Sequence, residues 1–220
     1  MPTTTPAPRE SDRIEAELRR MILELELEPG EMVSERQLMQ RCGGGRTPLR
    51  EACQRLAEQG LLALAPRQGV VIAPLSVFDF VEVMDAMAIA AGPAAALACR
   101  RLSAGQMEQL AAITAESEQA GAGGDYARQA ALDYEFHALL AEATGNRYLC
   151  EYLLRLHRSA SRFNLAAWMR DGGAPQSMDE HQRIIAALRE RDPAASRAEM
   201  LAHIASARQR IVGKLSPPID

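Results

Sequence analysis

Lysine is nearly absent from this sequence: Lys214 is the only one among 220 residues. Contacts to phosphate would therefore fall to arginine, whose guanidinium group pairs with phosphate oxygens. Aromatic residues make up only 4% of the chain, whereas apolar residues reach 47%. This composition is typical of a soluble, mostly helical protein built on alanine and leucine.

Cysteine is scarce and lacks the spacing of a metal or redox motif. Cys42, Cys53, Cys99 and Cys150 form no Cys-x-x-Cys pair, and we recognise no secretory signal before them. We expect reduced thiols in a cytoplasmic protein, packed as small apolar groups. Long hydrophobic runs are also missing, because the longest uncharged apolar run, Ala86–Cys99, is too short to span a bilayer.

Positive charge is unevenly distributed in a chain whose net charge is −4. Residues 1–35 hold four arginines and nine acidic residues, whereas residues 36–67 hold six arginines and two acidic residues. The second stretch therefore carries a local net charge of +4 inside an acidic protein. A confined basic patch is typical of a nucleic-acid contact, although an ordinary solvated surface has the same composition.

The basic stretch contains a sequence, GGGRTPLREA over 43–52, that predicts a tight turn opening a helix. Thr47 can cap that helix with its hydroxyl group, and Pro48 suits the first helical position. Arg46 and Arg50 then flank the helix start, where guanidinium groups can pair with phosphates or with guanine edges. We interpret this segment as the recognition helix of a winged helix-turn-helix.

Three helices and a β-hairpin are expected in the first third of the chain. Ser34 and Gln37 form a capping box that begins the second helix. Gly60 follows the third helix as its C-terminal cap. Apolar periodicity and β-prone runs supply the other bounds. The expected helices cover 11–27, 34–42 and 48–59, and the expected strands cover 61–64 and 70–72.

The remainder is expected to be an antiparallel helical bundle of six or seven helices, which makes the whole chain mainly α. Gly92-Pro93 is expected to kink or split its first segment. The periodic segments cover 76–101, 103–120, 125–143, 147–170, 177–191 and 193–213. The expected domains are a disordered tail over 1–10, a winged helix-turn-helix over 11–74, the bundle over 75–214 and a tail over 215–220.

Several motifs resemble the GntR family of bacterial transcription regulators. They are LEPGE over 27–31, SERQL over 34–38, RTPLREA over 46–52, Leu56, EQGLL over 58–62 and RQGVV over 67–71. The helical second part resembles the FadR-type branch, whose FCD domain binds effectors and dimerises. The resemblance implies that Arg36, Arg46, Thr47 and Arg50 contact operator DNA, and that Gly69 places the wing in the minor groove.

Two departures from the family pattern concern specificity. Gly44-Gly45 stands where the family usually has valine followed by serine or threonine, so a hydroxyl contact to DNA is missing. Many FCD proteins carry an arginine early in the first bundle helix, but the corresponding stretch, 84–93, has none. If that arginine normally holds an effector carboxylate, the effector of this protein differs in shape or charge, or the site holds only metal.

Four residues of the bundle predict a metal site. Asp133 and His137 stand four residues apart on one helix face, and His181 and His203 lie on two later helices. The resemblance implies the same set, because the FCD branch carries Asp-x-x-x-His and two later histidines. Imidazole and carboxylate ligands suit Zn, Ni, Mn or Fe(II), and the absence of cysteine argues against a closed structural zinc site. Taken singly, each histidine is more often an ordinary core or surface residue.

The remaining titratable groups of the bundle have ordinary interpretations. His157 is expected to be partly exposed. Arg155, Arg158 and Arg162 recur at helical spacing, and a solvated or dimer-facing stripe is favoured over a contact to an effector.

The functional prediction is a DNA-binding transcription regulator. It would bind a palindromic operator as a homodimer in the cytoplasm, away from membranes, under control of a small metabolite, with a carboxylate favoured, at the metal-containing site. The alternative is a metal-dependent hydrolytic enzyme that uses the same Asp/His cluster, although no spare general base, nucleophile motif or phosphate-binding loop accompanies it. A third possibility is a helical scaffold with structural histidines.

Overall fold

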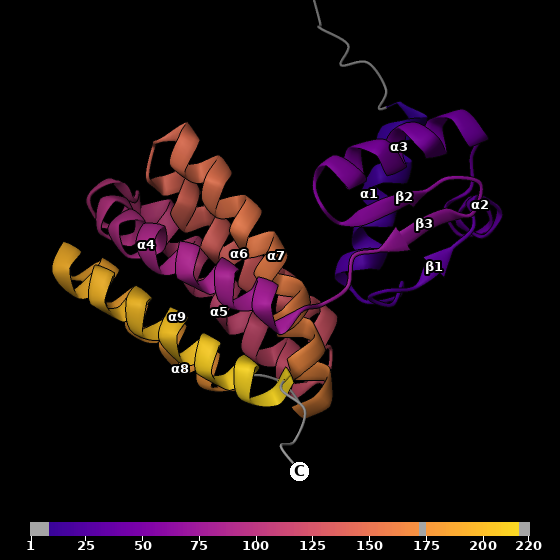
Figure 1. The fold of residues 1–220 in the computed structure, drawn as a ribbon. Helices are drawn as coiled ribbons and strands as arrows, with labels where there is room; N and C mark the ends of the chain where they lie inside the picture. Colours follow the sequence, from indigo (N-terminus) through magenta and orange to yellow (C-terminus); the bar gives the residue numbers. More distant parts are fainter. Residues whose placement is uncertain (1–8, 172–174, 216–220) are drawn as a thin grey trace, which may run out of the picture. The chain divides into compact units, whose positions relative to one another are not determined.

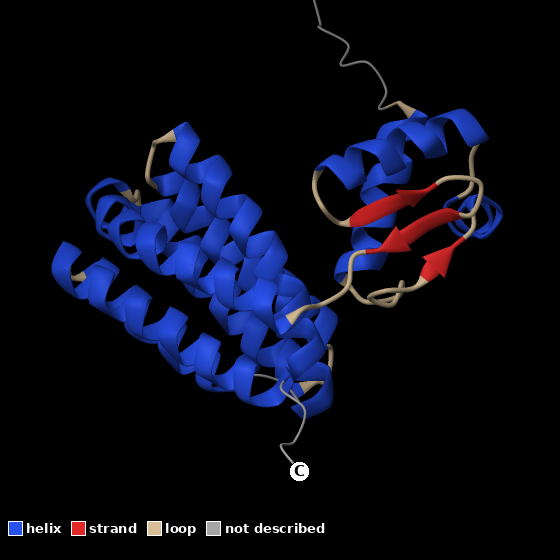
Figure 2. Ribbon diagram, viewed as in Figure 1, coloured by secondary structure: helices blue, strands red, loops and turns tan. Residues whose placement is uncertain are grey.

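A computed structural model describes residues 9–171 and 175–215. The chain divides between Leu75 and Ser76 into two compact units. The first unit combines helices with one small sheet, and the described part of the second is helical throughout (Figures 1 and 2). The predicted mainly α class is therefore confirmed.

The first unit has the element order of a winged helix-turn-helix. Its elements are α1 (Glu10–Leu23), β1 (Met32–Val33), α2 (Glu35–Cys42), α3 (Arg46–Glu58), β2 (Leu62–Ala65) and β3 (Gly69–Ile72). Fully buried leucine and isoleucine side chains from all three helices meet in one core, among them Ile14, Leu38 and Leu56. Cys42 and Cys53 are buried in the same core, as predicted for small apolar thiols.

The first helix is shorter than its apolar periodicity predicts. α1 ends at Leu23 because the chain turns there, and Leu25 adopts a φ of 59°. The backbone N–H of Leu27 then donates to the carbonyl of Met21 at 3.1 Å, and the Leu27 side chain enters the core. Leu27 is thus buried although it lies beyond the helix. Its apolar side chain continues the helical spacing in the sequence, which made the predicted helix too long.

The boundaries of α2 and α3 test two capping predictions. The Ser34–Gln37 capping box is confirmed, with the Ser34 hydroxyl accepting from the Gln37 backbone. The cap predicted at Thr47 is wrong, since α3 begins at Arg46 with Gly45 as its N-cap and no side-chain capping bond. Gly43 and its neighbour at 44 adopt positive φ, so the turn is completed before Arg46 and Thr47 already lies within the helix.

The sheet has the strand order β1-β3-β2, and both strand pairs are antiparallel (Figure 2). The predicted hairpin is present, with Leu62 opposite Ile72, whereas the two-residue β1 was not predicted. Gly69 has a φ of 124°, and a Cβ atom there would lie 2.1 Å from the carbonyl oxygen of Val33. Only glycine therefore lets the wing strand pass this close to β1.

The second unit is built from long helices. They are α4 (Val77–Arg101), α5 (Ala104–Ala122), α6 (Tyr126–Ala143), α7 (Arg147–Asp171), α8 (Pro175–Arg189) and α9 (Pro193–Leu215). The predicted split at Gly92-Pro93 is wrong, because α4 runs through it as one helix. At Gly92 the helix backbone lies against α9, and a Cβ atom there would meet the Leu201 side chain at 2.8 Å. The missing side chain at Gly92 thus lets α4 and α9 pack closely at this point.

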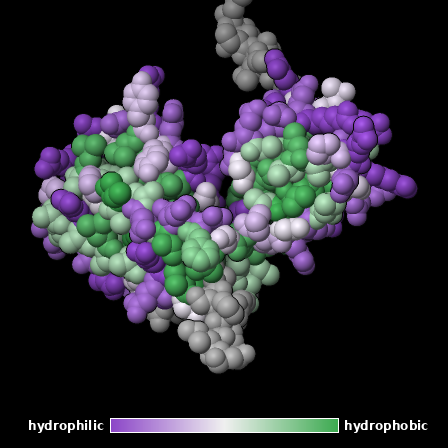
Figure 3. Space-filling view, in the orientation of Figure 1, coloured by the Kyte–Doolittle hydropathy of each residue, from purple (hydrophilic) through white to green (hydrophobic). Residues whose placement is uncertain are grey.

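α4 is long and apolar enough to cross a membrane by length and composition alone. Here its inner side contributes Phe80, Met84 and Met87 to the buried core of the bundle. Its outer side exposes Phe78 and Ile89, and Figure 3 shows hydrophobic residues at the surface of this unit. The apolar composition of α4 therefore serves the bundle core on one side and leaves apolar side chains uncovered on the other.

Candidate functional site

The predicted DNA-reading side chains lie on exposed helix surfaces. Arg46, Thr47 and Arg50 are exposed on α3, and Arg36 is exposed on α2. Gly69 begins β3 directly after the turn of the β2–β3 hairpin. The opposite face of α3 is buried through Leu49, Ala52, Cys53 and Leu56. The segment on which the regulator interpretation depends is thus helical, anchored on one side and open on the other.

Two of these arginines share one carboxylate partner. Glu35 at the start of α2 accepts hydrogen bonds from Arg50, with Nε–Oε1 at 2.7 Å and Nη2–Oε2 at 3.2 Å. The Nε atom of Arg46 lies 3.6 Å from the same carboxylate. Arg55 differs, because its guanidinium pairs with Glu15 of α1 at 2.5 Å. The basic segment therefore contains arginines that can reach a duplex and one that ties α3 to α1.

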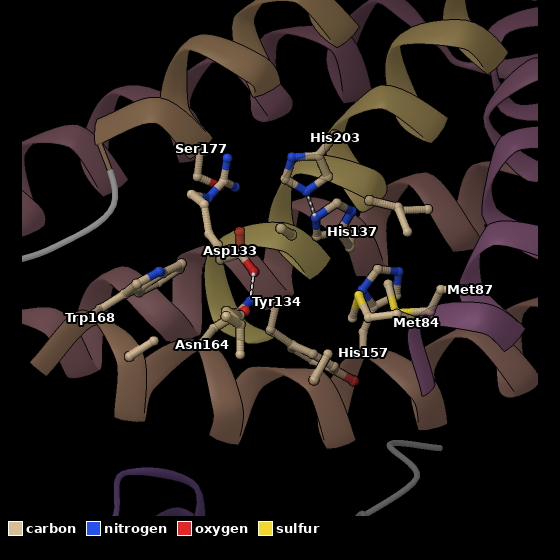
Figure 4. A pocket seen from close by; sticks show the side chains of 16 residues that line it. Met84, Met87, Asp133, Tyr134, His137, His157, Asn164, Trp168, Ser177 and His203 are labelled. Carbon is tan, nitrogen blue, oxygen red and sulfur yellow. Dashed lines mark hydrogen bonds between the residues drawn. The ribbon is translucent and has the colours of Figure 1, made fainter. Parts of the chain in front are cut away.

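The four residues of the predicted metal set meet inside the bundle. Figure 4 shows three of them, Asp133, His137 and His203. Asp133 and His137 come from α6, His181 from α8 and His203 from α9, and all four side chains are buried. The Nε2 atoms of His137 and His203 are 3.2 Å apart, and His181 Nε2 lies 3.5 Å from Asp133 Oδ1. One donor atom from each of the three histidines lies within 4.8 Å of the others.

These distances and the bonding state of the donors fit a divalent ion. Two nitrogen ligands about 2.0–2.1 Å from one tetrahedral zinc ion lie about 3.3 Å apart, close to the separation of the His137 and His203 nitrogens. Asp133 Oδ1, His181 Nε2 and His137 Nδ1 are buried and have no hydrogen-bond partner among the described residues. Buried polar atoms without partners are costly, and a coordinated cation would satisfy those that face it.

Burial sets the protonation of the cluster. It lowers the pKa of His137 and His181 well below the ordinary value, so both rings are neutral near pH 7. It raises the pKa of Asp133 to about 6, against the lowering influence of His203 and of a hydrogen bond from Asn164. Neutral imidazoles and an ionised carboxylate are the forms that bind metal, so near pH 7 the site needs little deprotonation.

A cavity of about 40 Å³ adjoins Asp133, His137 and His203. Apolar side chains form much of its wall, including Met84 and Met87 of α4 and Trp168 of α7. Tyr134 and Asn164 add polar groups. A space of this size holds a few water molecules or one small polar group beside a metal ion.

Each of the two units matches a known domain family. Residues 10–72 match the bacterial regulatory proteins of the gntR family, and residues 82–206 match the FCD domain. The chain is a member of the GntR family, in the branch that carries an FCD domain. This assignment confirms the resemblance inferred from the arginine, proline and glycine motifs of the first unit.

Similar proteins support the assignment over most of the chain. The Nta operon transcriptional regulator of Aminobacter aminovorans is 29% identical over 187 residues, which is 84% of this chain and 86% of that protein. The Uxu operon transcriptional regulator of Escherichia coli K12 is 26% identical and covers 96% of this chain and 90% of its own. The solved structure of E. coli McbR/YncC has the same fold, with a TM-score of 0.85 and 19% identity over 96% of this chain and 100% of its own.

Membership of this family establishes the coarse function. This GntR-family protein is a DNA-binding transcriptional regulator. Its relatives are regulators rather than enzymes, so the prediction of a non-enzyme is confirmed and the metal-dependent hydrolase is set aside.

Two predictions about α7 of the regulator are wrong. His157 is buried, lines the cavity and stacks on His137 with ring centroids 4.3 Å apart. Burial lowers its pKa to about 3. Arg162 is also buried rather than part of a solvated stripe, and burial lowers its pKa to about 10. The apolar spacing of Leu153 and Ala160 around His157 was the signal that places this histidine on the inner face.

Proposed function

We propose that this regulator controls operator binding through a divalent metal ion held by Asp133, His137, His181 and His203. The observation that carries the proposal is the convergence of one carboxylate and three imidazoles from three helices. Two of their facing atoms, Asp133 Oδ1 and His181 Nε2, are buried without a hydrogen-bond partner among the described residues. Zn, Ni, Mn or Fe(II) suits this donor set. A bound ion would supply open coordination positions for an anionic ligand.

The charge balance of the site favours an effector with one negative charge. The histidines with lowered pKa values are neutral, and Glu180 beside the site is neutralised by two hydrogen bonds from Arg210. A divalent ion together with the Asp133 carboxylate therefore leaves about one positive charge. A small carboxylate balances that charge, and the cavity has room for a small polar head beside the ion. This reasoning supports a carboxylate effector without an additional arginine.

The same helices that supply the ligands provide a route to the DNA-binding unit. α9 carries His203 and packs along α4, where Gly92 meets Leu201. α4 in turn begins at Val77, two residues after the end of the first unit at Leu75. We propose that effector binding changes how α6, α8 and α9 pack and thereby the freedom of the reading heads.

Operator recognition requires two copies of this regulator. One winged helix-turn-helix reads a half-site, so a homodimer fits a palindromic operator in the cytoplasm. Within each copy, Arg36, Arg46, Thr47 and Arg50 would contact DNA from α2 and α3, and Gly69 would set the wing against the minor groove. Their exposure and the close approach at Gly69 support these roles.

The proposal is tested by operator affinity in four states. A duplex selected from a random library with the purified protein is titrated by fluorescence anisotropy, with and without bound metal and with and without a panel of small carboxylates. We expect at least one carboxylate to change the Kd about fivefold or more in the metal-loaded protein and to have no effect after chelation. An equal response in chelated protein would overturn metal-linked control.

A further inference from the structure

We infer that Glu180 and Arg210 form a second layer that orients His203 as a metal ligand, an inference that rests on the metal site proposed above. Glu180 follows Asp179 on α8 and directly precedes His181, yet its carboxylate turns to His203 on α9. Glu180 Oε2 lies 2.8 Å from His203 Nδ1, and both side chains are buried.

Arg210 fixes the Glu180 carboxylate from the other side. Its Nη1 donates to Glu180 Oε1 at 2.7 Å, and its Nη2 donates to Oε2 at 3.1 Å. Arg210 Nη1 also bonds the hydroxyl group of Ser206, which lies one turn earlier on α9. A two-pronged guanidinium contact defines the plane of a carboxylate as well as its charge. Glu180 is therefore held as an acceptor in one orientation.

That orientation selects the tautomer of His203. An ionised carboxylate that is paired with a guanidinium group can only accept hydrogen bonds. The proton between Glu180 and His203 therefore belongs to the imidazole, and His203 Nδ1 donates to Glu180 Oε2. In the neutral ring the lone pair is then on Nε2, which lies 3.2 Å from His137 Nε2 at the centre of the donor set. Burial opposes the ionisation of Glu180, but its bonds with His203 and Arg210 hold its pKa well below the ordinary value.

The arrangement distinguishes His203 from its neighbour in the set. His137 Nδ1 is buried and has no hydrogen-bond partner within the described part of the chain, so no second-layer carboxylate orients that ring. Ligating histidines generally donate their second nitrogen to a carboxylate or carbonyl, and loss of that partner typically lowers metal affinity about 10–100-fold. Glu180 is thus a positioning residue for His203, and Arg210 is a positioning residue for Glu180.

The test compares Glu180→Gln with Glu199→Gln in the full-length protein. Glu199 of α9 pairs with Arg183 of α8 at 3.3 Å, so the control removes one carboxylate from the same two helices outside the metal set. Zinc affinity is measured by competition with a chromophoric chelator. We expect Glu180→Gln to bind zinc about 10–100-fold more weakly and Glu199→Gln to bind as wild type does. Equal affinity in folded Glu180→Gln and wild type overturns the inference while leaving the metal site intact.

A second measurement needs no variant. In metal-free wild-type protein, ¹⁵N NMR of the imidazole nitrogens reports which nitrogen of His203 is protonated, with His203→Gln used to assign its signals. Protonation at Nδ1 is expected, and protonation at Nε2 overturns the inference even if Glu180→Gln does not fold. Wild-type protein that binds none of zinc, nickel, manganese and iron(II) would overturn the proposed function and this inference together. Restored zinc affinity in Glu180→Asp relative to Glu180→Gln would support a role for the carboxylate charge.

Discussion

Glu35 of α2 accepts two hydrogen bonds from Arg50 of α3, of 2.7 and 3.2 Å, on the exposed side of the DNA-binding unit. The Arg46 guanidinium lies 3.6 Å from the same carboxylate. A side chain of the first helix of the helix-turn-helix therefore sets the position of two guanidinium groups on the second. The negative charge of the Glu35 carboxylate also repels DNA phosphates. It therefore weakens binding of the two arginines to duplexes in which they make no aligned contact.

Glu35→Gln is expected to loosen this control. Without the carboxylate, Arg46 and Arg50 gain freedom and the local net charge becomes more positive, so affinity for random duplex DNA should rise. Affinity for the selected operator should rise less, which lowers the specificity ratio by about tenfold if one guanine contact loses its alignment. Paired anisotropy titrations on both duplexes at one salt concentration measure the ratio. A ratio equal to that of wild type would contradict a positioning role for Glu35.

Arg46→Ala and Arg50→Ala are each expected to weaken operator binding by about 1–3 kcal/mol, because a guanidinium contact to a base or phosphate is lost. Arg128→Ala is the matched control: it removes the same charge from an exposed arginine of the helical unit, which pairs with Glu116 and Glu135. A gel-shift series with the three variants supplies the comparison. Should the α3 variants bind like the Arg128 control, the recognition-helix assignment would be wrong.

Metal binding is expected to stabilise the helical unit. A ligand that binds only the folded state at 100 times its Kd contributes about 2.7 kcal/mol, which corresponds to a rise in Tm of about 5–10 °C for a unit of this size. Scanning calorimetry of chelated protein with and without added zinc measures the shift. The Tm of His181→Ala should not respond to zinc at the same concentration. A zinc-dependent rise of equal size in that variant would mean that the ion binds elsewhere.

His157→Phe is expected to weaken effector binding without changing metal binding. Phenylalanine keeps a ring to stack on His137 but removes both ring nitrogens that can face the cavity. We expect unchanged metal content and an effector Kd weakened about two- to tenfold, the value of one lost hydrogen bond. Calorimetric titration of the metal-loaded variant with an active carboxylate measures it. An unchanged effector Kd would exclude a contact from His157.

Local sequence signals predicted the elements whose cause is local. The Ser34–Gln37 box marked the start of α2 because the capping bonds lie within four residues. Asp133 and His137 could be placed on one face because helix spacing alone decides it. The pairing of β1 with β3 could not be found this way, since Met32 meets Val71 across 39 positions and β1 has only two residues. The Glu180–His203 contact is likewise invisible without the packing of α8 on α9.

Polar residue type misled the interpretation of α7 in particular. Histidine and arginine are mostly exposed in proteins, so His157 and Arg162 were assigned to the surface. Their positions in the apolar repeat pointed inward, and the structure follows the repeat. At Pro93 the predicted split is also wrong, since α4 continues through Gly92-Pro93 as one helix that lies against Leu201 of α9 at Gly92. In α7, therefore, tertiary packing outweighed the usual exposure of histidine and arginine.

The metal content of the purified regulator tests the central proposal most directly. Protein expressed without added metal and purified without chelator is analysed by inductively coupled plasma mass spectrometry, alongside His181→Ala and the Glu199→Gln control. We expect close to one transition-metal ion per chain in wild type and control, and a large loss in His181→Ala. The proposed site would be contradicted if wild-type protein held no such ion even after incubation with zinc, nickel, manganese or iron(II). Equal metal content in wild type and His181→Ala would contradict it as well.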